Sequence, residues 1–259
     1  PPISGPFGSG IVTINGGVLD LNGKTVANLL SITGTGLGGN GVIINSSTTA
    51  GEASGAITMA AASSIGGTNP YSLSGAISGS YALTKLGTNT VYITGTGSNT
   101  STTISAGTLS IGSGGATGSI LSDVSISTGA TLVFNHSDDI TYAGIASGAG
   151  GLTQLGSGKL SLTGANTYSG LTTITTGTLQ VGTGGTTGSL GSGTVTNTTT
   201  LYINRSDAIT LSNVISGTGD LYKLGSNTAT LTANSNYTGA TNISAGTLVL
   251  SNNAPSTAT

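Results

Sequence analysis

Acidic side chains are the first residues in this sequence that could do chemistry. The 259 residues contain seven carboxylates, and the pair closest together is Asp138 and Asp139. Paired carboxylates act as acid and base when glycosidic bonds are cleaved. Neighbouring residues of a strand point to opposite faces, however. We therefore interpret this pair as part of a solvated turn, and not as a catalytic pair.

A histidine, a serine and an aspartate also stand side by side, at His136, Ser137 and Asp138. These residue types form the triads of nucleophilic enzymes. About 70 residues later the matching segment reads Arg205-Ser206-Asp207, and arginine does not release its proton in proteins. The exchange favours a loop in which Ser and Asp bond the nearby backbone. We predict no catalytic residues and a protein that is not an enzyme.

The residue types and their spacing do not indicate a metal or phosphate site. The chain has no cysteine, which excludes disulfides and thiolate metal sites, and it lacks the G-G-x-G-x-D repeat that binds calcium in some solenoids. Residues 112–118 and 182–188 fit a loose G-x-G-x-x-G spacing. No helix is predicted after either segment, so the helix N-terminus that holds phosphate is missing. We predict loops here, and neither a metal nor a cofactor.

Tyrosines are the remaining candidates, because aromatic faces suit the apolar surfaces of sugar rings. The chain has eight, and they are scattered through the sequence, as Tyr81, Tyr92, Tyr168, Tyr222 and Tyr237 illustrate. We interpret them mainly as packing residues at the corners of the fold, with sugar stacking as the alternative.

The overall composition excludes several classes of protein. Charged residues make up 5% of the chain, against about a quarter in an ordinary globular protein. The net charge is −2 without any cluster of Lys or Arg, so no nucleic-acid partner is expected. No apolar run reaches the ~18 residues of a membrane helix. The 35% of hydrophobic residues recur regularly, which predicts a folded chain and not a disordered one.

A short segment recurs at a fixed distance and indicates the architecture. Residues 83–87 read L-T-K-L-G, residues 152–156 read L-T-Q-L-G and residues 221–225 read L-Y-K-L-G. Each copy thus starts about 69 residues after the one before, a fixed period that is typical of repeat architectures. Within the copies apolar residues alternate with polar ones, the period of a strand with one buried face. A unit that cannot bury its own apolar face must stack on its neighbour, which predicts an all-β fold, a parallel β-solenoid.

The repeat length sets the expected dimensions. We divide 69 residues into three coils of about 23 residues each, which gives roughly 11 coils for the whole chain. We predict one solenoid domain over 1–259, with a diverged repeat carrying an insertion at 1–71, the insertion near 51–69, and tandem repeats at 72–140, 141–209 and 210–259. The predicted core contains Leu83, Leu86, Ile93, Ile104, Leu109, Leu152, Leu155, Leu162, Ile174, Leu179, Leu221, Leu231, Ile243 and Leu248.

The best-preserved copy resembles a known family. Residues 151–170, GLTQLGSGKLSLTGANTYSG, followed by Ile174 and G-T-L at 177–179, are similar to the passenger-associated repeat of autotransporter proteins. Residues 221–250 form a second good copy, and residues 83–111 form a third that lacks the tyrosine. The resemblance implies a right-handed parallel β-helix that is displayed outside a bacterial cell for adhesive or structural duty. It identifies no ligand.

Three functions follow in order of preference. We predict first a non-catalytic extracellular protein of the cell surface that builds a fibre, stalk or coat, and that self-associates end to end or laterally. The alternative is an autotransporter-type adhesin with a cell-surface or glycan ligand. The third is a carbohydrate-active enzyme or a protein similar to a phage tailspike. The sequence begins at Pro1 without Met or a secretion signal, which predicts a processed chain or a segment of a longer one.

Overall fold

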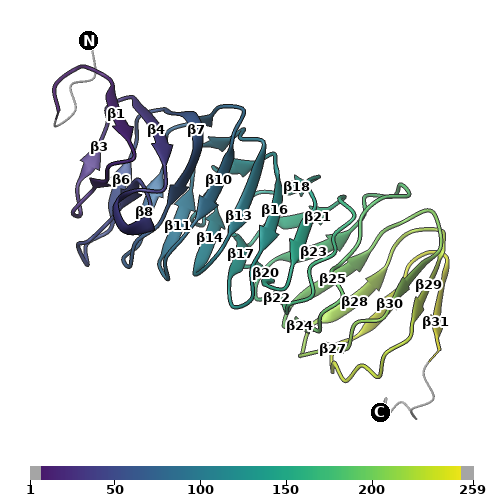
Figure 1. Ribbon diagram of the computed structural model, residues 1–259. Helices are drawn as coiled ribbons and strands as arrows, with labels where there is room; N and C mark the ends of the chain where they lie inside the picture. Colours follow the sequence, from purple (N-terminus) through teal and green to yellow (C-terminus); the bar gives the residue numbers. More distant parts are fainter. Residues whose placement is uncertain (1–6, 252–259) are drawn as a thin grey trace.

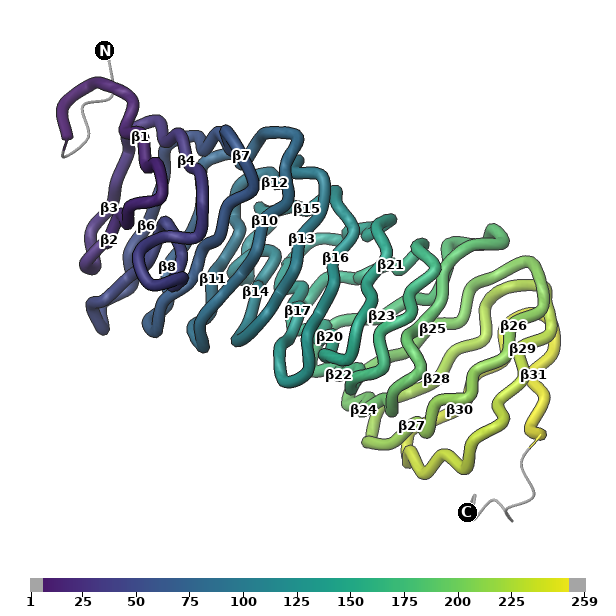
Figure 2. Tube along the Cα trace, viewed as in Figure 1, coloured from purple at the N-terminus to yellow at the C-terminus, as the bar shows by residue number. Residues whose placement is uncertain are grey.

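The chain folds into a rod of stacked coils, with β1 near one end and β31 near the other (Figure 1). The computed structural model describes residues 7–251. It is an all-β parallel solenoid of about 12 turns, so the predicted fold class is confirmed. The tube in Figure 2 shows the successive turns lying side by side along the rod. The one helical segment in the described range is the short 3₁₀ helix η1 (Leu37–Gly39).

Each turn crosses three faces in the same order. The first face carries β2 (Leu19–Asp20), β5 (Ile43–Ile44), the end of β7 (Ile57–Ile65), β10 (Ala82–Lys85), β13 (Ser101–Ile104), β16 (Asp123–Ile126), β19 (Ala146–Gly148), β26 (Ile209–Leu211), β29 (Thr228–Leu231) and β31 (Thr247–Leu250). The second face carries β3 (Thr25–Val26), β6 (Gly51–Ala53), β8 (Tyr71–Leu73), β11 (Thr90–Ile93), β14 (Thr108–Ile111), β17 (Thr131–Phe134), β20 (Gly151–Gln154), β22 (Thr172–Ile174), β24 (Val195–Asn197) and β27 (Ile215–Ser216). The third face carries β1 (Val12–Asn15), β4 (Leu30–Gly34), the start of β7, β9 (Ile77–Ser78), β12 (Thr96–Gly97), β15 (Ser119–Ile120), β18 (Ile140–Tyr142), β21 (Lys159–Leu162), β23 (Thr178–Val181), β25 (Thr200–Ile203), β28 (Asp220–Lys223) and β30 (Thr241–Ile243).

The turns are shorter than the repeat suggests. From Gly51 onward, residues paired across neighbouring strands are 18 to 23 positions apart, and Leu152, for example, pairs with Thr172. One sequence repeat is therefore longer than three turns, by about one third of a turn. Leu83 lies in β10 on the first face, whereas its repeat partner Leu152 lies in β20 on the second face. The third copy, Leu221, lies in β28 on the third face.

The predicted division of each repeat into three equal coils is therefore wrong. Sequence similarity reports the distance between like segments along the chain. The stacking distance is set instead by the hydrogen-bonded register of the strands, which depends on the length of every turn between them. Like segments of successive repeats consequently wind around the rod and do not form one column.

Most of the predicted core is confirmed. The side chains of Leu83, Ile93, Ile104, Leu109, Leu152, Leu162, Ile174, Leu179, Leu221 and Leu231 are buried. Four predictions are wrong. Leu86 is half-buried and Leu155 is 41% exposed, because strand alternation turns both outward. Ile243 is 54% exposed and Leu248 is partly buried, since both lie in the last described turn.

The predicted insertion near residues 51–69 stays a prediction. These residues contain β6 and β7, which pair with neighbouring strands. The longest steps in register join β4 to β7, where Leu30 pairs with Ile57, Ile32 with Met59 and Gly34 with Ser63. The shift between the last two pairs places extra residues within β7 itself.

Within the described range, no helix is long and apolar enough to cross a membrane.

Candidate functional site

Two outward loops of the same design lie beside the histidine and arginine segments that the sequence singles out. Loop 112–118 follows β14, and loop 182–188 follows β23. Both adopt positive φ at the first, third and seventh residue, all of which are glycine. At Gly188 a Cβ atom would meet the carbonyl oxygen of Leu162 at 2.3 Å. In both loops the loose G-x-G-x-x-G pattern thus provides the glycines that a tight bend of the backbone requires.

Each loop is bonded to the loop of the following turn. Gly114 N donates to Asn135 O at 2.8 Å, and Ser137 N donates to Gly115 O at 3.1 Å. One repeat later Gly184 N donates to Asn204 O, also at 2.8 Å. These backbone contacts therefore support the prediction that residues 136–138 form a loop.

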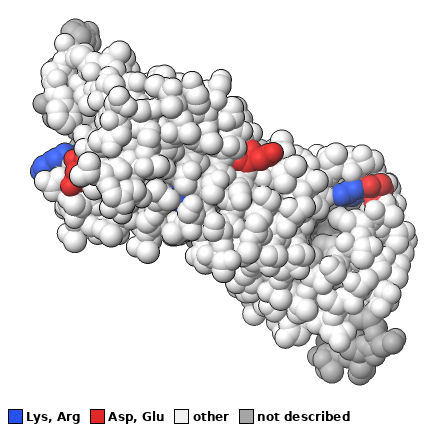
Figure 3. All heavy atoms as spheres, viewed as in Figure 1, with Lys and Arg blue, Asp and Glu red and all other residues white. Residues whose placement is uncertain are grey.

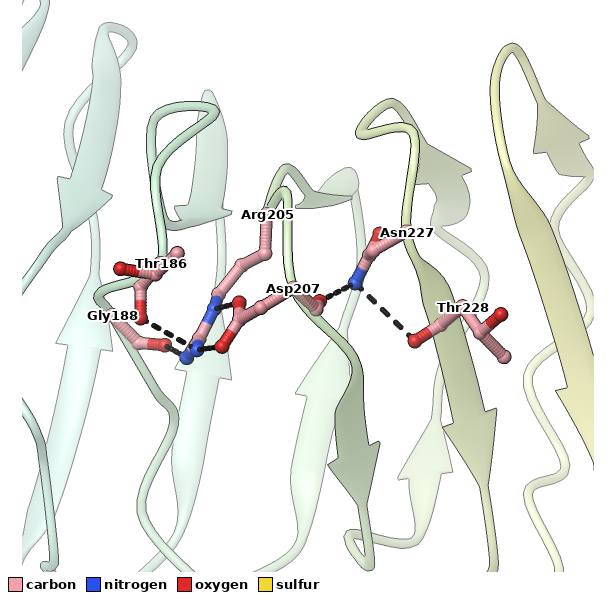
Figure 4. A network of polar contacts seen from close by, with 6 residues as sticks. All are labelled: Thr186, Gly188, Arg205, Asp207, Asn227 and Thr228. Atoms are coloured by element: carbon pink, nitrogen blue, oxygen red, sulfur yellow. Dashed lines mark hydrogen bonds and ion pairs between the residues drawn. The ribbon is translucent and has the colours of Figure 1, made fainter.

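Arg205 holds the second loop from the side (Figure 4). Its guanidinium donates to the carboxylate of Asp207 at 2.8 and 2.5 Å, to Gly188 O at 2.6 Å and to Thr186 O at 2.7 Å. The hydrogen bond from Arg205 lowers the pKa of Asp207. Asn227 of the next turn donates to the carbonyl of Asp207. This network links three successive segments of the solenoid.

His136 takes the place of Arg205 in the first loop, with fewer contacts. Its Nδ1 lies 3.0 Å from Oδ1 of Asp138. Its Nε2 is buried and has no hydrogen-bond partner in the described part of the chain. The side chain is 4% exposed. It lies against the backbone, since a Cβ on Gly112 would be 2.9 Å from Nε2. Ser137, by contrast, is an exposed residue of the turn.

Asp138 and Asp139 bind different partners. This agrees with the expectation that neighbouring side chains of an extended segment point in opposite directions. Asp139 accepts from the backbone N of Lys159 at 2.9 Å and pairs with its Nζ at 3.1 Å. The backbone hydrogen bond from Lys159 is the main cause of the lowered pKa of Asp139. No group of three or more His, Cys, Asp or Glu side chains gathers anywhere in residues 7–251. The absence of catalytic and metal-binding residues stays a prediction.

The tyrosines divide into two groups in the structure. Tyr168 is fully buried and its hydroxyl lies 2.7 Å from Oγ1 of Thr172, which agrees with a packing role. Tyr81 is 43% exposed, and Tyr92 and Tyr237 are half-buried.

An outward-facing pair of aromatic rings was not predicted from the sequence. Tyr202 and Tyr222 point outward from neighbouring strands of the third face, with ring centroids 5.1 Å apart. The separation of the two tyrosines along the chain equals one turn, so the true coil length would have revealed the pair.

Beneath each loop the surface is hollowed. A hollow of about 200 Å³ lies below loop 112–118, between β15 and β18. A larger one of about 340 Å³ lies between residues 189–192 and β26, with Arg205 at its edge. Residues 189 and 190 match 119 and 120 of the preceding repeat, and residues 209–211 match 140–142. The two hollows therefore arise from the same backbone feature, which is carried one face further around the rod.

Fold and site together define a repeat-built parallel β-solenoid with outward loops and shallow surface hollows. A family model described as the passenger-associated-transport-repeat matches residues 152–181 and 221–250. The chain thus contains two copies of the autotransporter passenger repeat, and the resemblance predicted from its sequence is confirmed.

A curated relative with a similar sequence is also an autotransporter protein. The chain is 44% identical over 88 residues to a protein named "Adhesin BmaC autotransporter" from Brucella suis biovar 1 (strain 1330). The similarity covers 32% of this chain and 3% of the relative, so the chain matches a small fraction of that protein's length. No solved structure matches the chain significantly.

Proposed function

We propose that this chain is a non-catalytic, rod-like segment of an autotransporter passenger, which lies outside the cell and presents an adhesive surface. The observation that carries the proposal is the union of passenger repeats with a continuous parallel solenoid. Such a fold is stiff, because each turn is bonded to its neighbours along its whole length. The name of the relative supports adhesion.

The outer faces suit adhesion to uncharged ligands. Few charged atoms interrupt the surface seen in Figure 3. Along the second face the outward row contains Thr153, Thr173, Thr196 and Ser216 in register. Hydroxyl side chains offer one donor and two acceptor sites each. A stack of such rows presents a long array of neutral hydrogen-bonding groups.

A non-catalytic role is supported by how the carboxylates are used. The carboxylate of Asp138 bonds to His136, that of Asp139 to Lys159 and that of Asp207 to Arg205. General acid–base catalysis needs such groups within reach of one substrate bond. Here Asp138 and Asp207 are bound within their own loops, and Asp139 is bound to the next turn.

The test is adhesion by the purified chain on an inert support. Beads coated with the chain should adhere to cultured epithelial cells or to extracellular-matrix proteins more strongly than beads coated with an unrelated β-solenoid of similar charge. Equal adhesion by the two bead types would contradict an adhesive role. Turnover of a polysaccharide by the chain would contradict the non-catalytic role.

Building of a fibre or coat is the second candidate, and the scarcity of charge favours it. A net charge of −2 over 259 residues gives little repulsion between neighbouring rods. Lateral packing of hydroxyl-lined faces would then produce a bundle. Sedimentation velocity and electron microscopy at rising concentration should show side-by-side assemblies. A chain that stays monomeric at all concentrations would overturn this candidate.

A further inference from the structure

The two hollows differ although their backbones correspond. In the smaller hollow the space is taken by aromatic rings. Phe134 and Tyr142 pack with their centroids 5.1 Å apart, and the Tyr142 hydroxyl donates to Ser122 O at 3.1 Å. In the following repeat the matching residues are Ile203 and Leu211, which are smaller and have no polar end.

The second hollow, which has the smaller side chains, is the larger of the two. Its volume is about 340 Å³, compared with about 200 Å³ in the first. Leu190 and Leu211 are buried at its base, and Ile209 also lines it. Ligand pockets commonly start at about 300 Å³, so the second hollow has room for a sugar ring or two and the first does not.

Hydroxyl groups from three successive turns surround the larger hollow. Thr167, Ser192, Thr210 and Ser212 line it and are exposed. None of these four hydroxyls bonds to another group in the described residues. They are therefore available as donors and acceptors. In the first hollow the position of Ser212 is occupied by Ala143.

The charge at the edge of the hollow is balanced. Arg205 lines the hollow, but its guanidinium is bonded to Asp207 and to two carbonyls. A phosphate or carboxylate ligand would have to displace these partners. A neutral ligand keeps them in place and uses the free hydroxyls, while its apolar side covers Leu190 and Leu211.

We infer that the hollow between residues 189–192 and β26 binds one or two residues of a neutral saccharide. A sugar ring has hydroxyls at its edge and C–H groups on its faces, and this matches a polar rim around an aliphatic base. Arg205, which is bonded to loop 182–188, lies at one edge of the hollow. The inference rests on the proposed adhesive function and names the ligand class for it.

The experiment measures saccharide binding by the purified chain and its variants. A glycan array is followed by saturation-transfer NMR with maltose, cellobiose, lactose and mannobiose as neutral probes and sialyllactose as a charged one. The double variant Thr210→Ala/Ser212→Ala removes two exposed hydroxyls. It should weaken the binding of a neutral probe about tenfold, the effect of losing one or two hydrogen bonds. Thr141→Ala, at the matching position of the smaller hollow, is the control and should change nothing.

A second variant fills the hollow with the residues of the preceding repeat. Ile203→Phe/Leu211→Tyr should abolish binding and keep the β-rich circular dichroism of the parent chain. If that variant does not fold, the alanine variant decides, because its two side chains are exposed and make no bonds. Absence of binding to any neutral glycan, or equal binding by parent and alanine variant, would overturn the inference. Bead adhesion that persists in the alanine variant would leave the adhesive function standing without this site.

Discussion

The ammonium group of Lys85 donates a hydrogen bond to the carbonyl oxygen of the next residue, Leu86, at 2.8 Å. The lysine therefore points into the solenoid, where it is fully buried, and the leucine beside it turns outward. Two further carbonyls, Gly87 O at 3.0 Å and Ala106 O at 3.2 Å, also accept from Nζ. The ammonium thus serves as a hydrogen-bond donor for a corner of the backbone.

The same position carries a similar donor in the other repeats. Gln154 donates to Gly156 O at 2.8 Å and Gly158 O at 2.9 Å, and Lys223 donates to Gly225 O and Ala245 O. The three corners lie on three different faces. A long inward donor is therefore a property of the repeat, independent of the face on which it falls.

Substitutions of Lys85 should show whether its side chain acts as a hydrogen-bond donor or only fills space in the core. We expect Lys85→Gln to lie within about 1 kcal/mol of the parent in free energy of unfolding, because the amide copies Gln154. Lys85→Leu leaves buried carbonyls without a donor and should cost about 2 kcal/mol or more. Urea denaturation measures both. A leucine variant as stable as the parent would contradict the role of the ammonium.

The stability of the chain should rise and then fall across alkaline pH. Burial lowers the pKa of Lys85 to about 8 and also lowers the pKa of Lys223. Unfolded lysine titrates near 10.4, so between these values the unfolded chain binds more protons and the free energy of unfolding increases with pH. For Lys85 the gain is at most about 3 kcal/mol.

Tyrosines reverse the trend at higher pH. Burial raises the pKa of Tyr71, Tyr142 and Tyr168 above the ordinary value. Their contribution to stability is present below the unfolded value of about 10 and is lost as the pH rises through it. Urea titrations from pH 7 to 11 should show a maximum near pH 10, and Lys85→Gln should reduce the rise before it. A parent stability that falls steadily from pH 8 would refute this assignment.

Arg205 should stabilise its loop more than His136 stabilises the other. Arg205→Ala removes an ion pair and two bonds to loop carbonyls, so amides of 182–188 should exchange with solvent at least about tenfold faster. His136→Ala removes one contact and should change the exchange of 112–118 less. Hydrogen-exchange mass spectrometry measures both loops in one experiment. The reverse order of effects would count against the stabilising contacts of Arg205.

The converse substitution should add the hydrogen bonds of Arg205 to the first loop. His136→Arg places a guanidinium opposite Ala116 and Gly118, which match the acceptors Thr186 and Gly188. We expect slower exchange in loop 112–118 and an increase of about 1 kcal/mol in the free energy of unfolding. Faster exchange would show that the two loops are not equivalent.

A comparison of Tyr168 with Tyr237 should show how much a buried tyrosine hydroxyl contributes to the free energy of unfolding. Each hydroxyl lies close to a threonine four residues on, at 2.7 Å from Thr172 and 2.6 Å from Thr241. The first pair is buried and the second is exposed. Tyr168→Phe should cost about 1 kcal/mol, because the threonine hydroxyl loses its partner away from water. Tyr237→Phe should cost less than about 0.5 kcal/mol, and equal costs would contradict the argument from burial.

The residues of the repeat determined the class of fold. Alternating apolar positions such as Leu160 and Leu162 require strands with one buried face, and a tandem unit without its own core requires stacking. The resemblance carried by residues 151–179 led to the family. The loop character of the H-S-D segment also followed from its exchange to R-S-D in the next repeat. These features are local, so the order of residues is sufficient to determine them.

The tertiary structure decided what lies side by side. The pairing of Tyr202 with Tyr222 and the inward turn of Lys85 both depend on coil length and strand register. Those quantities come from the geometry of many turns at once, and the repeat distance in the sequence does not reveal them. The larger hollow likewise results from residues of three different turns. Distance along the chain records none of these neighbours, because they meet only when the coils stack.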